Sequence, residues 1–267
     1  MSVWHNGEIK PDEAPLFTIA DRVRFGDGIF DSMLLIDGLP AHEDRHFAKL
    51  ERSAAIMGFE IQNEIETLRE HLPAFIRENG REKGRAGLNV IISRGPAPHG
   101  LAIPENPALQ VALRVFPVPE SFPAVEAVFA RTVRRNEGSP LSQIKNFNYG
   151  DNIMAAQEAR QKGANEALML NNAGHMACAT IATLVIQQGG KLYTPPLSDG
   201  AQGGVTRGLL IERYGMIEKS LTEQDVTNAD GVYLSNSIRG LVPVVKLEGQ
   251  ARTNASLSDI DKGFHLL

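Results

Sequence analysis

Three segments of the chain combine residue types that could do chemistry. Lys145 lies in SQIKNFNYGDN, between a strand-like segment and an alanine-rich helical one, where burial would lower the pKa of its amine and make it nucleophilic. The run QGGVTRGLLIE, from Gln202 to Glu212, would bring backbone N–H groups and a hydroxyl to a helix N-terminus, which attracts anions. The run YLSNSIRGLVPV, from Tyr233 to Val244, ends a predicted strand in hydroxyl side chains that suit a phosphate or a carboxylate.

Each segment also has a purely structural interpretation, and none is specific by itself. Lysines are mostly exposed, so Lys145 taken alone fits a solvated surface residue. The two glycines before Val205 and Thr206 fit a capped helix after a flexible turn. Ser235 and Ser237 fit a polar turn that closes a hairpin. Whether these residues take part in chemistry therefore depends on how the fold positions the three segments.

The elements that must position these segments belong to an α+β fold. Asn6-Gly7 and Asp37-Gly38 predict two hairpins. Helical spacing of apolar residues predicts helices over about 42–58 and 64–79. An alanine-rich helix is predicted over about 149–163, and a further helix begins near 204–206. The proline-rich run 116–123 predicts a linker, so we expect an N-terminal domain over 1–117 and a larger domain over 118–267 that carries Lys145. Strands are predicted in GLNVIISRG, ALQVALRVFPV, AVEAVFARTVRR, EALMLNN, TLVIQQGGKLYTP and GVYLSNS.

The composition argues against several classes of protein. The chain has 267 residues and a formal net charge of −5, which disfavours nucleic acid as a main partner. Its single cysteine excludes an intrachain disulfide and a cysteine-rich zinc site, and no metal site is expected. The first residues are too polar for a signal peptide, and no run approaches the length of a membrane span. We therefore expect a cytoplasmic protein without a membrane partner.

Over its whole length the sequence resembles the class IV aminotransferase family, which includes D-amino-acid and branched-chain aminotransferases and aminodeoxychorismate lyase. The resemblance implies the two-domain, fold-type IV architecture of pyridoxal 5'-phosphate (PLP) enzymes, with a small-molecule amino acid or amine as substrate and a homodimer as the assembly. It is carried by the runs DRVRFGDGIFDSM, HFAKLERSA, VIISRG, IKNFNYGDNIMAAQEARQKGANEALML, GHMACATIATLVI, GGVTR and SNSIRGLVPV.

The resemblance also implies roles for individual residues. Lys145 matches the lysine that holds PLP as a Schiff base and then shuttles the Cα proton. Asn148-Tyr149 resembles an Asn-Tyr pair in branched-chain enzymes, where the tyrosine contacts the phenolic oxygen of the cofactor. The remaining matches assign cofactor-phosphate contacts to Val205, Thr206 and Ser237, and substrate contacts to Phe30, His99 and Ile238.

Three positions depart from the family pattern. Lys49 stands where the family has an arginine that binds the phosphate. Lysine keeps the charge but loses the bidentate fork, and Arg45 is a possible substitute one turn earlier.

Cys178 replaces the carboxylate that keeps the pyridine nitrogen protonated. A neutral thiol offers this nitrogen only a weak hydrogen bond, and the alternative is that Cys178 is a small buried residue that fills space in the core. His99 occupies a loop position that often carries a carboxylate-binding arginine, and a neutral imidazole cannot replace that contact.

The function expected from this resemblance is PLP-dependent transamination with Lys145 as the proton-transfer group. A pyruvate-releasing lyase like aminodeoxychorismate lyase is an alternative, because it starts from the same proton abstraction. A second alternative is a protein of the same fold that has lost catalysis and serves in binding or dimerisation, since both Lys49 and Cys178 depart from the pattern.

Overall fold

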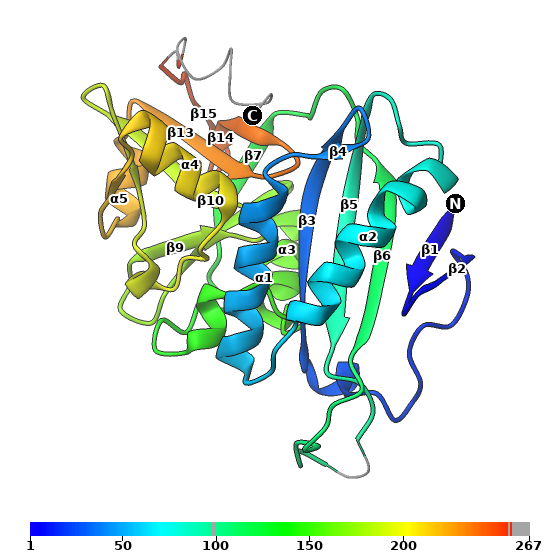
Figure 1. The fold of residues 1–267 in the computed structure, drawn as a ribbon. Coiled ribbons are helices and arrows are strands. Elements are labelled where there is room, and N and C mark those ends of the chain that lie inside the picture. Colours follow the sequence, from blue (N-terminus) through cyan, green and yellow to red (C-terminus); the bar gives the residue numbers. More distant parts are fainter. Residues whose placement is uncertain (98–99, 256, 258–267) are drawn as a thin grey trace. The chain divides into compact units, whose positions relative to one another are not determined.

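The computed structural model describes residues 1–97, 100–255 and 257 and is coloured along the sequence in Figure 1. The chain forms two compact units. The first contains Met1–Glu120 and Lys145–Asn148, and the second contains Ser121–Ile144 with the described part of Tyr149–Leu267. In the described ranges no helix is both long enough and apolar enough to cross a lipid bilayer.

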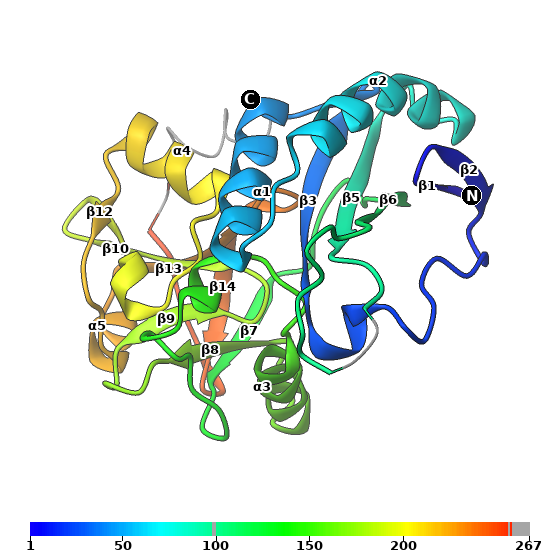
Figure 2. The ribbon, with the colours of Figure 1, turned by 60° about the horizontal axis from the view of Figure 1, so that its bottom comes forward.

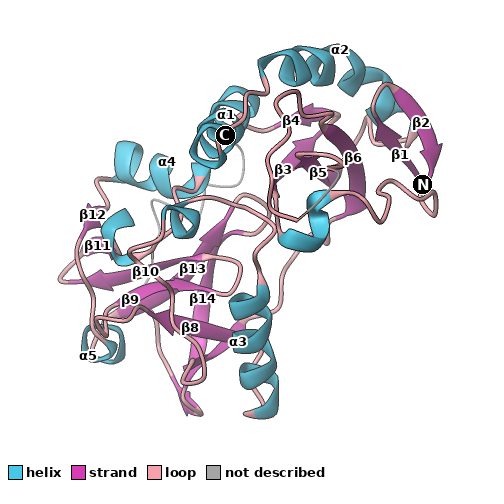
Figure 3. Cartoon of the chain, turned by 90° about the horizontal axis from the view of Figure 1, so that it is seen from below, coloured by secondary structure: helices cyan, strands magenta, loops and turns pink. Residues whose placement is uncertain are grey.

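The first unit is a six-stranded antiparallel sheet with two helices on one face, as Figures 1 and 3 show. The strand order is β2-β1-β6-β5-β3-β4. A single 3-10 turn, η1 (Arg22–Phe25), precedes β3. The elements are β1 (Ser2–His5), β2 (Glu8–Pro11), β3 (Gly28–Ile36), β4 (Leu39–Pro40), α1 (Glu43–Met57), α2 (Gln62–Glu78), β5 (Arg85–Ser93) and β6 (Gln110–Pro117).

The two predicted hairpins of this unit are confirmed. Asn6 and Gly7 have φ angles of 47° and 93°, and Asp37 and Gly38 have φ angles of 48° and 79°. Two successive residues with positive φ match the right-handed twist of the strands that they connect, and Asn-Gly and Asp-Gly tolerate this conformation best. The two predicted helices are also confirmed, with bounds that shift by two residues or fewer at each end.

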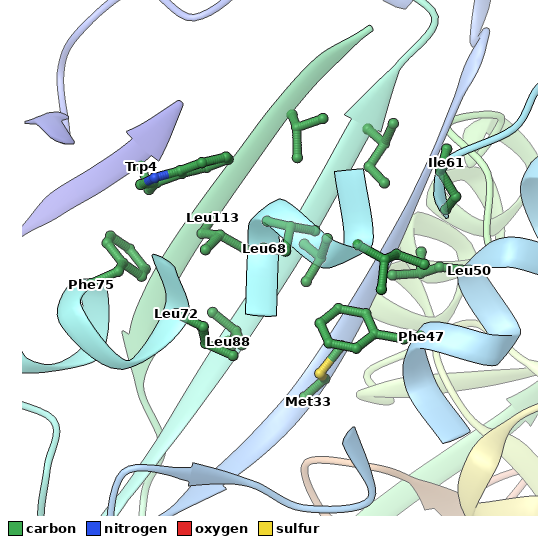
Figure 4. Close-up of a cluster of buried hydrophobic side chains, with 14 of the residues drawn as sticks. Trp4, Met33, Phe47, Leu50, Ile61, Leu68, Leu72, Phe75, Leu88 and Leu113 are labelled. Carbon is green, nitrogen blue, oxygen red and sulfur yellow. The ribbon is translucent and has the colours of Figure 1, made fainter. Parts of the chain in front are cut away.

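The core of the first unit lies between the helices and the sheet (Figure 4). Apolar residues at helical spacing on α1 and α2 face the alternating inward residues of β3, β5 and β6. The labelled members of this cluster are Trp4, Met33, Phe47, Leu50, Ile61, Leu68, Leu72, Phe75, Leu88 and Leu113. This packing fixes α1 against β3, which carries the charged residues described below.

The second unit contains a nine-stranded mixed sheet in the order β12-β11-β10-β13-β14-β7-β8-β9, with β15 paired to β14. Figure 2 shows α3 packed beside β8 in this unit. The elements are β7 (Val125–Phe129), η2 (Pro140–Gln143), α3 (Gly150–Gln161), β8 (Glu166–Leu170), β9 (Met176–Ala179), β10 (Thr183–Gln188), β11 (Lys191–Thr194), η3 (Leu197–Asp199), α4 (Val205–Tyr214), β12 (Ile217–Glu218), α5 (Glu223–Thr227), β13 (Gly231–Asn236), β14 (Gly240–Leu247) and β15 (Gln250–Ala251).

Several predictions for this unit need adjustment. The strand predicted over AVEAVFARTVRR ends at Phe129, and the run TLVIQQGGKLYTP forms two strands, β10 and β11, joined at Gly189-Gly190. Strands β9 and β14 were not predicted. Strand β14 pairs with the distant strand β7, and the pairings of both β14 and β9 contain a register irregularity. Alternation of apolar and polar residues along one segment does not reveal either feature.

Lys145 belongs to the first unit, so its assignment to the second domain is wrong. The hairpin strand β4 pairs only with Leu35 and Ile36, which leaves the start of β3 with an open edge. The segment around Lys145 fills this edge: the Phe30 N–H donates to the Lys145 carbonyl at 3.0 Å, and the Phe147 N–H donates to the Gly28 carbonyl at 3.1 Å. Free backbone groups at a strand edge attract such pairing, and no local sequence pattern encodes it.

Candidate active site

Lys145 is held among three side chains of β3. Its Nζ donates a hydrogen bond to Ser32 Oγ at 3.1 Å, lies 3.8 Å from Asp31 Oδ1 and stands 4.7 Å from the centroid of the Phe30 ring. Ser32 Oγ in turn donates to Asn89 Oδ1 at 2.8 Å, so its lone pairs face Lys145. The lysine side chain is 20% exposed. The amine is therefore fixed in place and largely removed from water.

The surroundings of Lys145 favour the uncharged amine. Burial lowers its pKa to about 8, against the attraction of the Asp31 carboxylate, and the charge of Lys49 lowers it as well. At pH 7 about a tenth of the molecules then carry a free amine, compared with far fewer for an ordinary lysine. A lysine of this kind is a nucleophile and a proton acceptor near neutral pH.

Asp31 is the buried centre of a charged cluster in the first unit. Lys49 Nζ lies 3.0 Å from Asp31 Oδ1, and His46 Nδ1 lies 2.7 Å from Asp31 Oδ2. Burial alone would raise the pKa of Asp31, but the Lys49 ammonium and the His46 hydrogen bond hold it well below its usual range. Asp31 is therefore an anion under all ordinary conditions.

The sequence reasoning missed the roles of Asp31, Ser32, His46 and Asn89. A signal was present: alternation in GIFDSMLLI puts Asp31 on the same face as the buried Ile29, Met33 and Leu35. A carboxylate on a buried face requires cationic or hydrogen-bonding partners. Spacing along α1 supplies two such partners, because His46 and Lys49 are three residues apart and share a helix face.

In the second unit, the predicted anion site lies at the start of α4. Val205 and Thr206 are the first two helical residues, and the N-cap residue Gly204 makes no side-chain cap. Thr206 Oγ lies 3.3 Å from Ser237 Oγ, so two hydroxyls gather beside the first turn. Free N–H groups of a ten-residue helix together with two hydroxyls suit a phosphate.

The turn after β13 holds Ser237 and Ile238 in place. The Asn236 side-chain oxygen accepts the backbone N–H groups of Ile238 at 3.1 Å and Arg239 at 2.9 Å. Ser237 and Ile238 are both half-buried. The local signal, Ser-Asn-Ser at a strand end, thus corresponds to an ordered turn whose hydroxyl reaches the start of α4.

Cys178 is a buried thiol in β9, paired with Met169 of β8. Burial raises its pKa, with Arg135 acting in the opposite direction and Glu166 in the same one. The thiol is therefore neutral near pH 7 and can donate only weakly. Its neighbour Glu166 is also buried, and burial raises its pKa although Thr180 donates to it.

The remaining predicted residues are distributed as follows. Tyr149 is the N-cap residue of α3, is half-buried and belongs to the second unit. Phe30 is half-buried in β3, with its ring centroid 6.3 Å from that of Phe147. His99 lies outside the described residues. Among the residues that the structure describes, no group of three or more His, Cys, Asp or Glu side chains could hold a metal ion.

Comparison with known proteins decides the family. Residues 28–247 match the family model for amino-transferase class IV, which is most of the chain and includes both the Lys145 cluster and the start of α4. The chain belongs to this family. Class IV aminotransferases are PLP-dependent transaminases and lyases.

Relatives within the family differ in the reactions that their names state. The chain is 27% identical to a D-alanine aminotransferase of Bacillus licheniformis, over 94% of this chain and 89% of the relative. A Legionella pneumophila structure provisionally assigned as a 4-amino-4-deoxychorismate lyase is 30% identical, covers 94% of both chains and superposes with a TM-score of 0.86. The Escherichia coli branched-chain amino acid aminotransferase superposes with a TM-score of 0.89 at 23% identity, over 98% of this chain and 93% of that one. These matches confirm the predicted fold-type IV architecture.

Each unit of this class IV protein carries residues whose chemistry suits one part of the family's cofactor. Lys145 offers an amine that burial keeps partly uncharged, which suits an aldehyde. The hydroxyls of Thr206 and Ser237 at the start of α4 suit a phosphate. Cys178 is a neutral thiol at a position where the family pattern has a carboxylate, and a thiol lacks the charge with which a carboxylate stabilises a protonated ring nitrogen.

Proposed function

We propose that this protein is a PLP-dependent transaminase that acts on an amino acid or amine through Lys145. The observation that supports the proposal best is the Lys145 amine itself, which is held by Ser32 and has its pKa lowered to about 8 by burial. A structural surface lysine would be solvated and fully charged at neutral pH. Transamination is preferred over elimination because it is the broader activity of the family.

In this proposal, bound PLP would supply an aldehyde for condensation with amines and a ring that withdraws electrons from the substrate Cα. Lys145 Nζ would hold the aldehyde carbon, and after displacement by the substrate amine it would take a proton from Cα and return it. Ser32 Oγ orients Nζ by accepting its hydrogen bond. Val205, Thr206 and Ser237 would hold the phosphate, Tyr149 the phenolic oxygen, and Phe30, Ile238 and His99 would contact the substrate.

The direct experiment measures the cofactor on the purified full-length chain. We expect a yellow absorbance band on addition of PLP and fixation of the cofactor to the Lys145 peptide by borohydride. The variant Lys145→Met should lose both signals, whereas Lys83→Met, which alters an exposed lysine of the same unit, should retain both. A colourless protein that does not respond to PLP would instead support the binding or dimerisation protein of the same fold.

Cys178 offers a second test of the proposed orientation of the cofactor. The variant Cys178→Glu would place a carboxylate where the wild-type thiol is neutral. If the thiol faces the ring nitrogen, this variant should strengthen the absorbance of the protonated cofactor and accelerate exchange of the substrate Cα proton for deuterium. An unchanged spectrum would show that Cys178 does not face the nitrogen.

A pyruvate-releasing lyase is the second candidate, and the 30% identity to the Legionella protein favours it. A panel of L-amino acids, D-amino acids, arylalkyl amines and aminodeoxychorismate separates the two reactions. Transamination should convert the cofactor spectrum with a single amino donor and restore it with a keto acid. Elimination should release pyruvate without any amino acceptor. Light scattering on the same samples tests the homodimer that we propose by analogy with the family.

A further inference from the structure

We propose that Lys49 is a positioning residue that takes the hydrogen bond of the Asp31 carboxylate and thereby weakens the pairing of this carboxylate with Lys145. This inference deepens the proposed function and rests on it, because it assigns Lys49 to the preparation of the reacting lysine. It also removes Lys49 from the phosphate role that its position in the family pattern implies.

The geometry of the cluster supports this assignment. Lys49 and Lys145 approach the same oxygen, Asp31 Oδ1, at 3.0 Å and 3.8 Å. Only the shorter of these distances is a hydrogen bond. The other carboxylate oxygen, Oδ2, is taken by His46 Nδ1 at 2.7 Å. Asp31 therefore has both of its oxygens engaged by α1, and Lys145 donates to Ser32 instead.

The burial of these side chains makes it costly for Lys145 to replace Lys49 on the Asp31 carboxylate. The side chain of Asp31 is 3% exposed and that of Lys49 is 8% exposed, whereas that of Lys145 is 20% exposed. A buried ammonium that leaves its carboxylate would lose its only strong compensation for lost hydration. Lys49 comes from α1, whose residues Phe47 and Leu50 are locked in the core beside it, so the Lys49–Asp31 pair is built into the scaffold.

The charges around Lys145 act in opposite directions. Asp31 raises the pKa of Lys145 and Lys49 lowers it, on top of the lowering by burial. The groups that the structure places on Asp31 are Lys49 and His46 from α1 and Lys145 from the edge segment. Without Lys49, Asp31 Oδ1 would have no hydrogen-bonded cation from α1, so the carboxylate would attract the Lys145 ammonium and hold its proton. With Lys49 in place, the Lys49–Asp31 pair carries almost no net charge. Lys145 can therefore release its proton.

The experiment measures Lys145 in the full-length, cofactor-free chain, so it does not depend on catalysis. Trace acetylation with acetic anhydride between pH 6 and 10 is quantified by mass spectrometry on the Lys145 peptide, with exposed Lys83 as the internal reference. For Lys49→Met we expect about tenfold less Lys145 acetylation at pH 7 than in the wild type. Lys49→Arg keeps the charge and should restore the wild-type profile, while Asp31→Asn should shift the profile in the opposite direction.

A second measurement separates this role from phosphate binding. Capture of pyridoxal, which lacks the phosphate, and of PLP is followed by absorbance in the same variants. We expect Lys49→Met to slow both aldehydes by the same factor, because the reacting amine is changed. The proposal is overturned if the acetylation profile of Lys49→Met matches that of the wild type, or if only PLP capture is slowed. Failure of the proposed function would give a different result. The wild-type protein would then show the expected pH profile of Lys145 acetylation but would not capture PLP.

Discussion

Asp27, just before β3, and Asp31, within β3, are two buried carboxylates of the first unit whose partners differ in chemistry. Asp27 Oδ2 is shared by Arg22 Nε at 2.5 Å and Arg94 Nε at 2.8 Å. Asp31 is shared by Lys49, Lys145 and His46. One cluster is made of guanidinium groups, which stay protonated in proteins, and the other contains amines and an imidazole, which can lose a proton.

The arginine cluster ties together backbone that is distant in sequence. Arg94 donates to the carbonyls of Met57 and Gly58 at the end of α1, and Arg22 donates to the carbonyl of Ala102. Since these arginine donors are directed at fixed acceptors and guanidinium groups stay protonated in proteins, the Asp27 cluster is structural. The Asp31 cluster leaves one of its cations, Lys145, with a hydroxyl as its only hydrogen-bonded partner among the described residues. Although both carboxylates are buried, the Asp27 cluster holds distant backbone segments rigidly, whereas the Asp31 cluster allows Lys145 to release its proton.

The largest effect is expected from Asp27→Asn. Removing this charge leaves two buried guanidinium groups without their carboxylate, which should lower the free energy of unfolding by about 3–5 kcal/mol. The loss should be the same at every pH between 6 and 9, because arginine cannot neutralise itself. Urea denaturation at several pH values measures it. A loss that shrinks as the pH rises would mean that the two clusters do not differ in the way described.

A smaller effect is expected from Asp31→Asn, about 1–3 kcal/mol at pH 7, because buried lysines can release protons when their counter-ion is removed. In the folded variant Lys145 should lose its proton at a lower pH than in the folded wild type, where its pKa is about 8 and the Asp31 charge raises it. Between pH 7 and pH 9 the unfolded chain then exceeds the folded chain in bound protons by more in the variant than in the wild type. The stability of the variant therefore rises more steeply with pH, and the loss relative to the wild type should narrow from pH 7 to pH 9. The same urea series measures it, and a constant loss would contradict the assignment.

The wild-type pH profile of Lys145 sharpens the comparison further. Since burial lowers the pKa of Lys145 to about 8, its reactivity toward acetic anhydride should rise about tenfold per pH unit up to pH 8 and then level off. The reactivity rises with pH because the deprotonated amine of Lys145 is the form that reacts. A Lys145 profile that still rises at pH 10 would show that burial does not act as described.

The smallest effect is expected from a surface cluster in which Arg69 of α2 pairs with two carboxylates of α1. Arg69 bonds to Glu43 at 2.6 Å and to Asp44 at 2.7 Å, with its side chain 39% exposed. Arg69→Met keeps a long side chain over Phe47 and should cost no more than about 1 kcal/mol, because exposed pairs are screened by water and salt. Thermal denaturation at low and high salt measures it. A loss as large as that of Asp27→Asn would show that pairing, rather than burial, sets the energies of these clusters.

The sequence by itself determined the local elements and the chemical identity of the candidate groups. Asn6-Gly7 and Asp37-Gly38 fixed two hairpins because few residues tolerate positive φ. Helical spacing located α1 and α2 to within two residues, and an alanine-rich segment located α3 equally well. Ordered motifs around Lys145 and Thr206 were sufficient to indicate the family, which the match over residues 28–247 confirmed.

Only the tertiary structure decided which of these groups meet. Lys145 and Asp31 are 114 residues apart in the chain, and they meet because a segment distant in sequence pairs with the edge of β3 that β4 leaves open. The position of Lys49 in the family pattern pointed to a phosphate, yet its ammonium lies on a buried carboxylate. Sequence patterns record periodicity along one element, whereas the partner of a buried charge is set by long-range strand pairing and helix packing.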